Sequence, residues 1–155
     1  MPDNTTSTVL LIDEPAPLIR RLTLNRPDKR NALNDDLRGA LFAALREADR
    51  SDDVSVVIIR GAGPAFCAGY DLGSPNSDVE RPIGRADGWW SRHVVNNWFE
   101  MWDMNTPIIA QVHGYCLAGG TELATACDLG YWGGRNVNRH SGHDEAKEQD
   151  RDTAD

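Results

Sequence analysis

A thiol and a carboxylate lie on either side of a glycine pair in the stretch GYCLAGGTELATACDL, residues 114–129. Cys116 could act as a nucleophile, and Glu122 could move a proton or orient a water molecule. Gly119 and Gly120 fall at the start of a predicted helix, where backbone N–H groups lack intrahelical acceptors and lie at the positive end of the helix dipole. The stretch therefore offers three candidate agents, which are the sulfur, the acid and the backbone amides between them.

A second glycine-containing turn follows another apolar run, in FCAGYDL at residues 66–72. Gly69 can adopt a positive φ angle and lets a ligand approach the backbone closely. One amide from each turn could hold a single carbonyl oxygen as that oxygen gains charge, and such a donor contributes about 3 to 4 kcal/mol in a transition state. Taken singly, each turn is better explained as an ordinary tight turn.

The two acids near these turns also have structural interpretations. Glu122 could be a helix N-terminal acid that is stabilised by the dipole rather than a catalyst. Asp71 is better explained as a side chain that braces its loop than as an acid catalyst. His113 ends an apolar run and is given no catalytic role.

Positive charge is concentrated in residues 20–30, although the chain has a net charge of −8. Five of the 16 basic residues fall there, with one opposing acid, Asp28; they are Arg20, Arg21, Arg26, Lys29 and Arg30. The cluster is either a solvated edge or a site for a small anionic ligand such as a phosphate-bearing molecule. The negative total argues against nucleic-acid binding through a basic face.

Apolar periodicity predicts buried strands that alternate with helices. The order is strand, strand, helix, strand, helix, strand, helix and, after it, a possible further strand. Asn34 and Asp35 are N-cap candidates for the first helix, in which Leu37, Leu41 and Leu45 share a face. This order implies an α/β fold with parallel pairing, in which ligands bind where strands end in glycine-rich turns. The expected strands are 8–13, 18–24, 55–60, 107–112 and 129–132, the two central ones buried on both faces, and the expected helices are 34–48, 88–104 and 121–127.

The chain divides by composition into a folded core and polar ends. Residues 133–155 contain only three aliphatic residues, Val137, Ala146 and Ala154, so this tail is expected to be disordered. Residues 1–7 are expected to be flexible, and residues 8–132 to form one domain. The three cysteines are expected to be small buried thiols of a reducing compartment. No leader or membrane-spanning run is visible, so a soluble, cytoplasmic protein is expected, with no membrane or metal site.

Three segments together resemble the enoyl-CoA hydratase/isomerase (crotonase) superfamily: LNRPDKRNALN at 24–34, VVIIRGAGPAFCAGYDL at 56–72 and QVHGYCLAGGTELATACDL at 111–129. The resemblance covers residues 8–132 and implies a spiral of ββα units, here incomplete at the C-terminus, that holds an acyl-CoA thioester. Coenzyme A would enter as part of the substrate, with no separate cofactor. Members of the family form trimers or hexamers, which is doubtful for this chain.

The resemblance also implies roles for individual residues. Ala68 and Gly119 match the two amides of the family's oxyanion hole, which stabilises a thioester enolate, and Glu122 matches one of two catalytic glutamates. The remaining matched positions would bind coenzyme A or the thioester end of the substrate: Arg30, Ala32, Ala68, Gly69, Tyr70, Asp71 and Gly119. The family's second carboxylate would fall about twenty residues after Glu122, where this chain has Gly142. The change in composition after Trp132 suggests a truncated or frameshifted reading frame.

Two alternatives to an active hydratase or isomerase are open. The first is a catalytically inactive, acyl-CoA-binding remnant, because the second carboxylate and the segments that close the site are not recognised. The second is an α/β-hydrolase with Cys116 as nucleophile on a strand–turn–helix elbow. That enzyme needs an acid and a histidine downstream, but His140 and His143 both lie in the polar tail.

Overall fold

The computed structural model describes residues 9–73 and 95–133 of the chain. The expected flexible N-terminus, the polar tail and the first part of the expected helix 88–104, including Trp90 and Val94, lie outside these residues.

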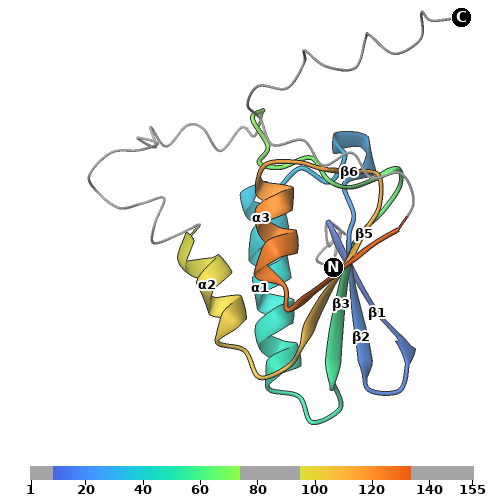
Figure 1. Ribbon diagram of the computed structural model, residues 1–155, viewed down its shortest axis with the longest axis vertical. Coiled ribbons are helices and arrows are strands. Elements are labelled where there is room, and N and C mark those ends of the chain that lie inside the picture. The colour runs from blue at the N-terminus through green and yellow to red at the C-terminus, as the bar shows by residue number, and fades with distance from the viewer. Residues whose placement is uncertain (1–8, 74–94, 134–155) are drawn as a thin grey trace, which may run out of the picture.

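Three successive strand–strand–helix units make up the chain, and a further strand follows them (Figure 1). This arrangement confirms the predicted α/β fold of ββα units. The first unit is β1 (Leu10–Ala16), β2 (Ile19–Leu24), a short 3-10 turn η1 (Pro27–Lys29) and α1 (Asp35–Asp49); the second is β3 (Val56–Gly61), β4 (Ala65–Cys67) and α2 (Asn96–Trp102); the third is β5 (Ile108–Val112), β6 (Tyr115–Cys116) and α3 (Gly119–Ala126), followed by β7 (Leu129–Trp132).

Five strands form the main sheet in the order β1-β2-β3-β5-β7. β1 pairs with β2 antiparallel through a hairpin, and every other pair in this sheet is parallel. β4 and β6 form a separate two-stranded parallel sheet. These two strands are only three and two residues long, which is too short for an apolar pattern to reveal, and they were not predicted.

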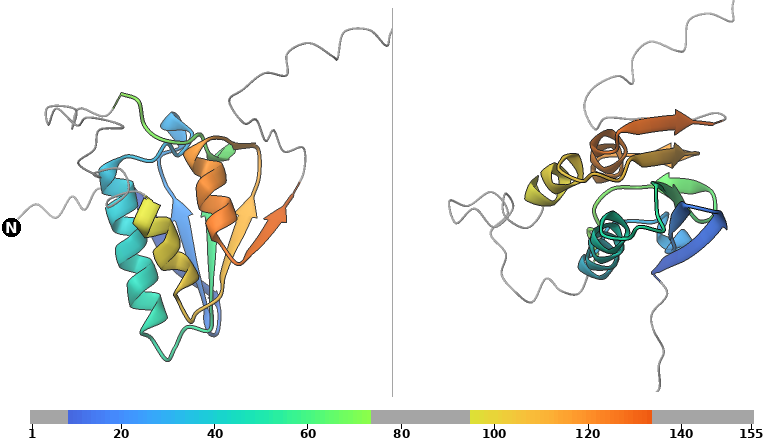
Figure 2. Two further views of the ribbon diagram at one scale, coloured as in Figure 1. Left: turned by 60° about the vertical axis from the view of Figure 1, so that its left-hand side comes forward. Right: turned by 90° about the horizontal axis from the view of Figure 1, so that it is seen from below.

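The three helices lie on one face of the main sheet, as Figure 2 shows. The core between them contains the predicted apolar stripe of α1, together with Phe42, Met101 and Leu123. Asn34 caps α1 as predicted, because its side chain accepts a hydrogen bond from the backbone N–H of Leu37 at 3.0 Å. The helix thus begins where the sequence places it.

The opposite face of the main sheet is covered by none of the described elements. The prediction that β3 and β5 are buried on both faces is therefore wrong. Both strands alternate along their length between buried and more exposed residues. Their β-branched composition suits a strand packed on one side only, because the apolar stems of the outward residues still cover the sheet.

Candidate functional site

The two glycine-containing turns meet beyond the ends of β3 and β5. The backbone N–H of Leu117 donates to the carbonyl of Cys67 at 3.0 Å, which ties β6 to the end of β4. Gly69 has a φ angle of +98°, and a Cβ atom there would lie 3.3 Å from the backbone nitrogen of Gly119. A side chain at 69 would therefore crowd the start of α3, and glycine permits the close approach.

The Ala68 amide is not available as an oxyanion donor in this structure. Its N–H donates to the carbonyl oxygen of Arg30 at 2.9 Å. Arg30 ends the 3-10 turn with a left-handed conformation, φ 49° and ψ 38°. The pairing continues as Leu33 donates to Gly69 at 2.7 Å and Asp71 to Leu33 at 2.9 Å. The prediction of two free amides is thus wrong at Ala68, because residues 30–33 run alongside residues 68–71 and take up that donor.

The Gly119 amide is available. Gly119 is the first residue of α3, and none of the described residues accepts a hydrogen bond from its N–H. The preceding residue, Ala118, has φ 44° and ψ −118°, a conformation that L-residues seldom adopt. Strained backbone of this kind is common at ligand sites. The role of the Gly119 N–H as an oxyanion donor stays a prediction.

The Glu122 carboxylate is held by two aromatic side chains. Its Oε2 accepts hydrogen bonds from the Tyr70 hydroxyl and from Nε1 of Trp98, the latter at 3.2 Å. Trp98 is buried, and its ring centroid lies 5.5 Å from that of Phe42. Burial, and secondarily the bond to Glu122, raise the pKa of Tyr70, so the phenol stays protonated and acts as a donor. Glu122 itself is an exposed residue within the described structure.

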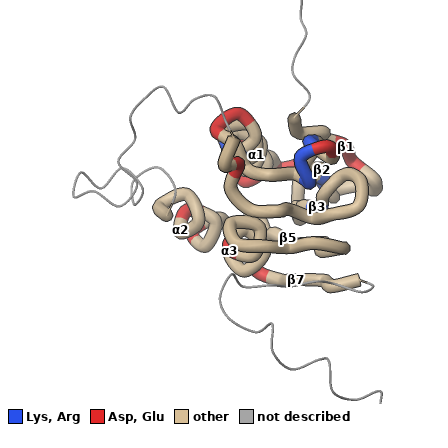
Figure 3. The backbone as a smooth tube through the Cα atoms, turned by 90° about the horizontal axis from the view of Figure 1, so that it is seen from above, with Lys and Arg blue, Asp and Glu red and all other residues tan. Residues whose placement is uncertain are grey.

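Most of the basic cluster is neutralised by the protein itself. Arg20 pairs with Glu14 and Glu47, Arg21 with Asp13, and Arg26 with Asp71. Figure 3 shows the basic positions of β2 beside the acidic positions of β1. Among the described residues, Lys29 and Arg30 are exposed and have no carboxylate within ion-pair distance. Only these two of the five remain for an external anion.

Asp71 is a brace, as the sequence suggests. One carboxylate oxygen accepts from the Gly73 amide at 2.9 Å, and the other pairs with Arg26 at 2.7 Å. The Arg26 guanidinium also donates to the carbonyl of Ala32. Because of the bonds from Arg26 and then Gly73, the pKa of Asp71 lies below its usual value. Asp71 and Ala32 thus fix the loop geometry, and the structure places both beside Arg26.

The cysteines do not form a nucleophilic centre. Cys116 has no exposed surface, and burial raises its pKa. Burial likewise raises the pKa values of Cys67 and Cys127 to about 12. A thiol in such surroundings is a poor nucleophile, since the thiolate is the reactive form. The sulfur atoms fill the core, and the Cys116 hydrolase alternative loses its reactive group.

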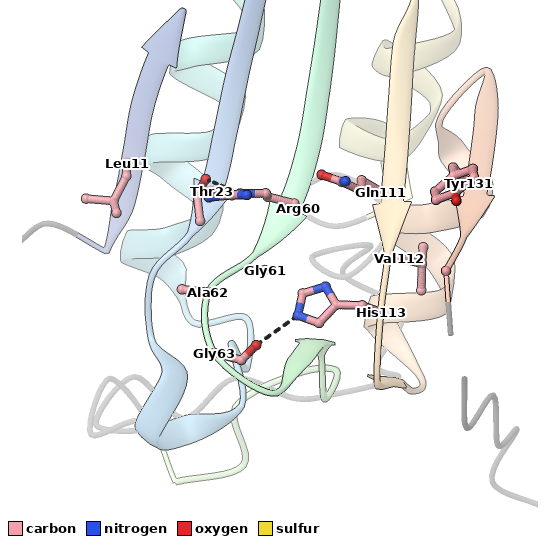
Figure 4. A pocket seen from close by; sticks show the side chains of 11 residues that line it. Leu11, Thr23, Arg60, Gly61, Ala62, Gly63, Gln111, Val112, His113 and Tyr131 are labelled. Carbon is pink, nitrogen blue, oxygen red and sulfur yellow. Dashed lines mark hydrogen bonds between the residues drawn. The ribbon is translucent and has the colours of Figure 1, made fainter. Parts of the chain in front are cut away.

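A hollow of about 560 Å³ lies on the open face of the main sheet, away from the predicted site residues (Figure 4). Thr23, Arg60, Gln111 and Tyr131 line it along the sheet. His113 also faces it and bonds through Nε2 to the carbonyl of Gly63 at 2.9 Å, which matches its predicted structural role. None of the residues predicted to act on a ligand contributes to this hollow.

Two features of the site were missed by sequence reasoning. Asn31 is completely buried and left-handed, with φ 57°. Its side chain donates to the carbonyls of Ala62 and Ala65 at 2.9 and 2.8 Å, and accepts from the Arg26 amide at 2.9 Å. The second feature is the contact of Tyr70 and Trp98 with Glu122. The only sequence feature that could have indicated the buried Asn31 is its position as an uncharged residue beside a run of basic ones. No sequence feature indicated the contact of Tyr70 and Trp98 with Glu122.

Neither a metal centre nor a membrane span is found in the described ranges. No three side chains of His, Cys, Asp or Glu in residues 9–73 and 95–133 cluster to hold a metal ion. The helices in the same ranges are all too short or too polar to cross a bilayer.

Comparison with known proteins adds independent findings. The family model for enoyl-CoA hydratase/isomerase matches residues 17–137. The mitochondrial Delta(3,5)-Delta(2,4)-dienoyl-CoA isomerase of Homo sapiens is 36% identical over 120 residues, which are 73% of this chain and 37% of that protein. A "Probable enoyl-CoA hydratase" of Mycobacterium tuberculosis is 36% identical over 121 residues, 78% of this chain and 44% of that protein. The chain thus spans less than half of each of these relatives.

Solved structures of enoyl-CoA hydratase/isomerase proteins also match this chain. An enoyl-CoA hydratase/isomerase from Xanthobacter autotrophicus Py2 superposes with a TM-score of 0.73 at 34% identity, covering 86% of this chain and 49% of that one. A monofunctional enoyl-CoA isomerase from M. smegmatis superposes with a TM-score of 0.68 at 27% identity, covering 86% and 54%. The names of the curated relatives include mitochondrial and peroxisomal proteins, so the cytoplasmic location stays a prediction.

Proposed function

The chain belongs to the enoyl-CoA hydratase/isomerase family, and we propose that the turns around Gly69 and Gly119 bind an acyl-CoA thioester on which Glu122 acts as acid and base. The observation that carries this proposal is the position of the Glu122 carboxylate. It is held by Tyr70, whose own ring lies against Gly119, the residue with the available amide. An acid and a donor for a developing negative charge therefore adjoin one another.

The chemistry follows from these two groups. The Gly119 N–H donates to the thioester oxygen and stabilises the enolate that forms when a proton leaves the α-carbon. Glu122 takes that proton and, in a double-bond shift, returns it to another carbon of the same chain. Ala68 becomes a second donor only if its bond to the Arg30 carbonyl opens. The thioester oxygen would then replace that carbonyl as the acceptor of the Ala68 N–H, and the Arg30 carbonyl would need another donor, such as water.

A double-bond shift needs only one acid, which is the reason to favour it over hydration. Hydration by the paired carboxylates of the family needs a second acid, and the matched position, Gly142, lies outside the described residues. Lys29 and Arg30 are the basic side chains that we assign to the phosphates of coenzyme A, since both are exposed and neither forms an ion pair with a described carboxylate; the Arg30 guanidinium lies over the ring of Tyr115. No separate cofactor is invoked.

Acyl-CoA binding without turnover is the second candidate. One observation favours it: Glu122 is exposed rather than enclosed. An exposed carboxylate is surrounded by water, which weakens its electrostatic interaction with a substrate.

Paired assays on purified chain separate the two candidates. Hydration of crotonyl-CoA, isomerisation of a 3-enoyl-CoA and calorimetric binding of a saturated acyl-CoA are compared in the wild type, Glu122→Gln and the control Asp53→Asn, an exposed loop acid. The proposal expects binding by all three proteins and turnover lost about 100-fold or more only in Glu122→Gln. Binding without turnover in every protein would favour the second candidate, and absence of binding would reject both.

A further inference from the structure

Hydrogen bonds join the side chains of Tyr70, Trp98 and Glu122 to one another. The Trp98 Nε1 lies 3.2 Å from Oε2 of Glu122 and 3.2 Å from the hydroxyl oxygen of Tyr70, and that hydroxyl donates to the same Oε2. The three side chains come from three separate elements: the turn after β4, helix α2 and helix α3. Their meeting point therefore depends on the fold and not on local sequence.

Packing fixes both aromatic donors. Trp98 is 8% exposed and stacks at a tilt on Phe42 of α1. The Tyr70 ring lies so close to Gly119 that a Cβ atom there would be 2.6 Å from its Cε2. The start of α3 therefore limits the movement of the ring on that side. The Tyr70 hydroxyl consequently reaches Glu122 from a restricted range of directions.

The two oxygens of the Glu122 carboxylate are not equivalent. Oε2 accepts from both aromatic donors, whereas none of the described residues donates to Oε1. A carboxylate that is anchored by one oxygen keeps its orientation while the other oxygen is available to a ligand. This matters for an exposed glutamate, because its free side chain would otherwise sample many rotamers.

We infer that Tyr70 and Trp98 are positioning residues, which hold Glu122 by Oε2 so that Oε1 is directed to the substrate. The inference rests on the proposed function for its catalytic consequence, but the anchoring itself is a property of the free protein. Loss of one donor should reduce the fraction of Glu122 in the productive orientation. It should leave most of the contacts to the acyl-CoA unchanged.

Turnover gives the first test, with the full chain and a 3-enoyl-CoA as substrate. Tyr70→Phe keeps the ring over Gly119 and removes only the hydroxyl, and Trp98→Phe removes the indole N–H. Each is expected to lower kcat about tenfold or more with KM changed less than about twofold, because a hydrogen bond to a charged group is lost while binding is kept. Tyr131→Phe and Trp102→Phe, both exposed, are the matched controls and should behave as wild type.

The second test needs no substrate and reads the Trp98 indole N–H resonance by NMR, assigned from its loss in Trp98→Phe. Glu122→Gln should move this resonance upfield, since a neutral amide is a weaker acceptor than a carboxylate. Tyr70→Phe should also move it, and Tyr131→Phe should not. If the chemical shift of the Trp98 indole N–H is the same in Glu122→Gln as in the wild type, the inference is overturned. A kcat of Tyr70→Phe equal to that of the wild type also overturns it. If no acyl-CoA is turned over, the proposed function falls, and the NMR result alone decides the anchoring.

Discussion

Ala118 holds an unfavourable backbone conformation immediately before the available amide. Its φ of 44° and ψ of −118° lie outside the regions that a Cβ atom tolerates well. This geometry turns the peptide between 118 and 119 and leaves the Gly119 N–H without an acceptor among the described residues. The conformation of Ala118 could not be predicted from the sequence, because alanine seldom adopts a positive φ and nothing at this position indicates one.

Replacing Ala118 with glycine should stabilise the fold. Glycine removes a strain of about 1 to 3 kcal/mol and adds unfolded-state entropy worth about 0.4 to 1 kcal/mol, so we expect a net gain near 1 kcal/mol. Urea unfolding followed by tryptophan fluorescence measures it. Gly39→Ala, at an exposed and uncrowded helical position, is the comparison, because it makes the reverse replacement, of glycine by alanine, in an unstrained backbone. A loss of stability in Ala118→Gly would mean that the strain is absent.

Asp71 should make stability depend on pH in the acid range. Its folded pKa is lowered by Arg26 and Gly73, so its contribution is present above the unfolded pKa of about 4 and is lost as pH falls through the folded value. Asp71→Asn should therefore be less stable than wild type at pH 7, with the difference shrinking towards pH 3. Urea midpoints at both values check this, with the exposed Asp36→Asn as control. An equal difference at both pH values would contradict the assignment.

Individual residues were predictable where side-chain chemistry decided their place. The capping of α1 by Asn34 and the bracing by Asp71 follow from short polar side chains near backbone amides. The occupied amide of Ala68 was not predictable. A backbone N–H has no sequence signature, and its partner at Arg30 is determined by how two distant loops pack.

At the level of elements, the segment between β2 and α1 is fastened by one buried side chain. Asn31 links this loop to the β3–β4 connection through two hydrogen bonds, to the carbonyls of Ala62 and Ala65, and accepts a third from the Arg26 amide within the loop itself. It thereby positions Arg30, whose carbonyl occupies the Ala68 amide. Hydrogen bonds through Asn31 and Arg30 thus connect the β2–α1 loop to the predicted oxyanion turn at Ala68.

Asn31→Ala should destabilise the protein by about 3 kcal/mol or more, because it leaves buried backbone groups unsatisfied and puts a Cβ residue without a local hydrogen bond into a left-handed conformation. Chemical denaturation measures this loss. Asn105→Ala, on an exposed loop, serves as the comparison and should change stability by less than about 0.5 kcal/mol. Equal stability of the two variants would show that Asn31 is not a fastening residue.

The longer elements were predictable because their apolar spacing repeats over several turns or residues. The amphipathic α1 and the strands β2, β3 and β5 were placed within one or two residues. The two short strands β4 and β6 were not predicted, because two or three residues are too few to show an alternation of apolar and polar side chains. The expected burial of β3 on both faces failed because sequence cannot tell which side of a sheet a later element covers.

For the whole molecule, the sheet ends in an apolar edge. β7 pairs only with β5 in the described structure, and Leu129 and Tyr131 are 63% and 65% exposed. Unpaired strand edges with apolar side chains promote association between chains.

We expect the purified chain to self-associate with rising concentration, and Tyr131→Lys to reduce this by placing a charge on the edge. Sedimentation velocity over a concentration series measures the effect. Lys29→Gln, which changes one exposed charge far from β7 in sequence, is the comparison and should leave association unaltered. A wild-type chain that stays monomeric throughout the series would contradict the prediction.

The most direct test of the central claim is exchange of the α-proton of a saturated acyl-CoA in deuterium oxide, followed by NMR. This reaction needs one acid and one stabilised enolate, and it does not require a second carboxylate. We predict that the wild-type chain catalyses this exchange and that Glu122→Gln slows it about 100-fold or more, with acyl-CoA still bound. Binding without exchange in the wild type, or equal exchange in the two proteins, would contradict it.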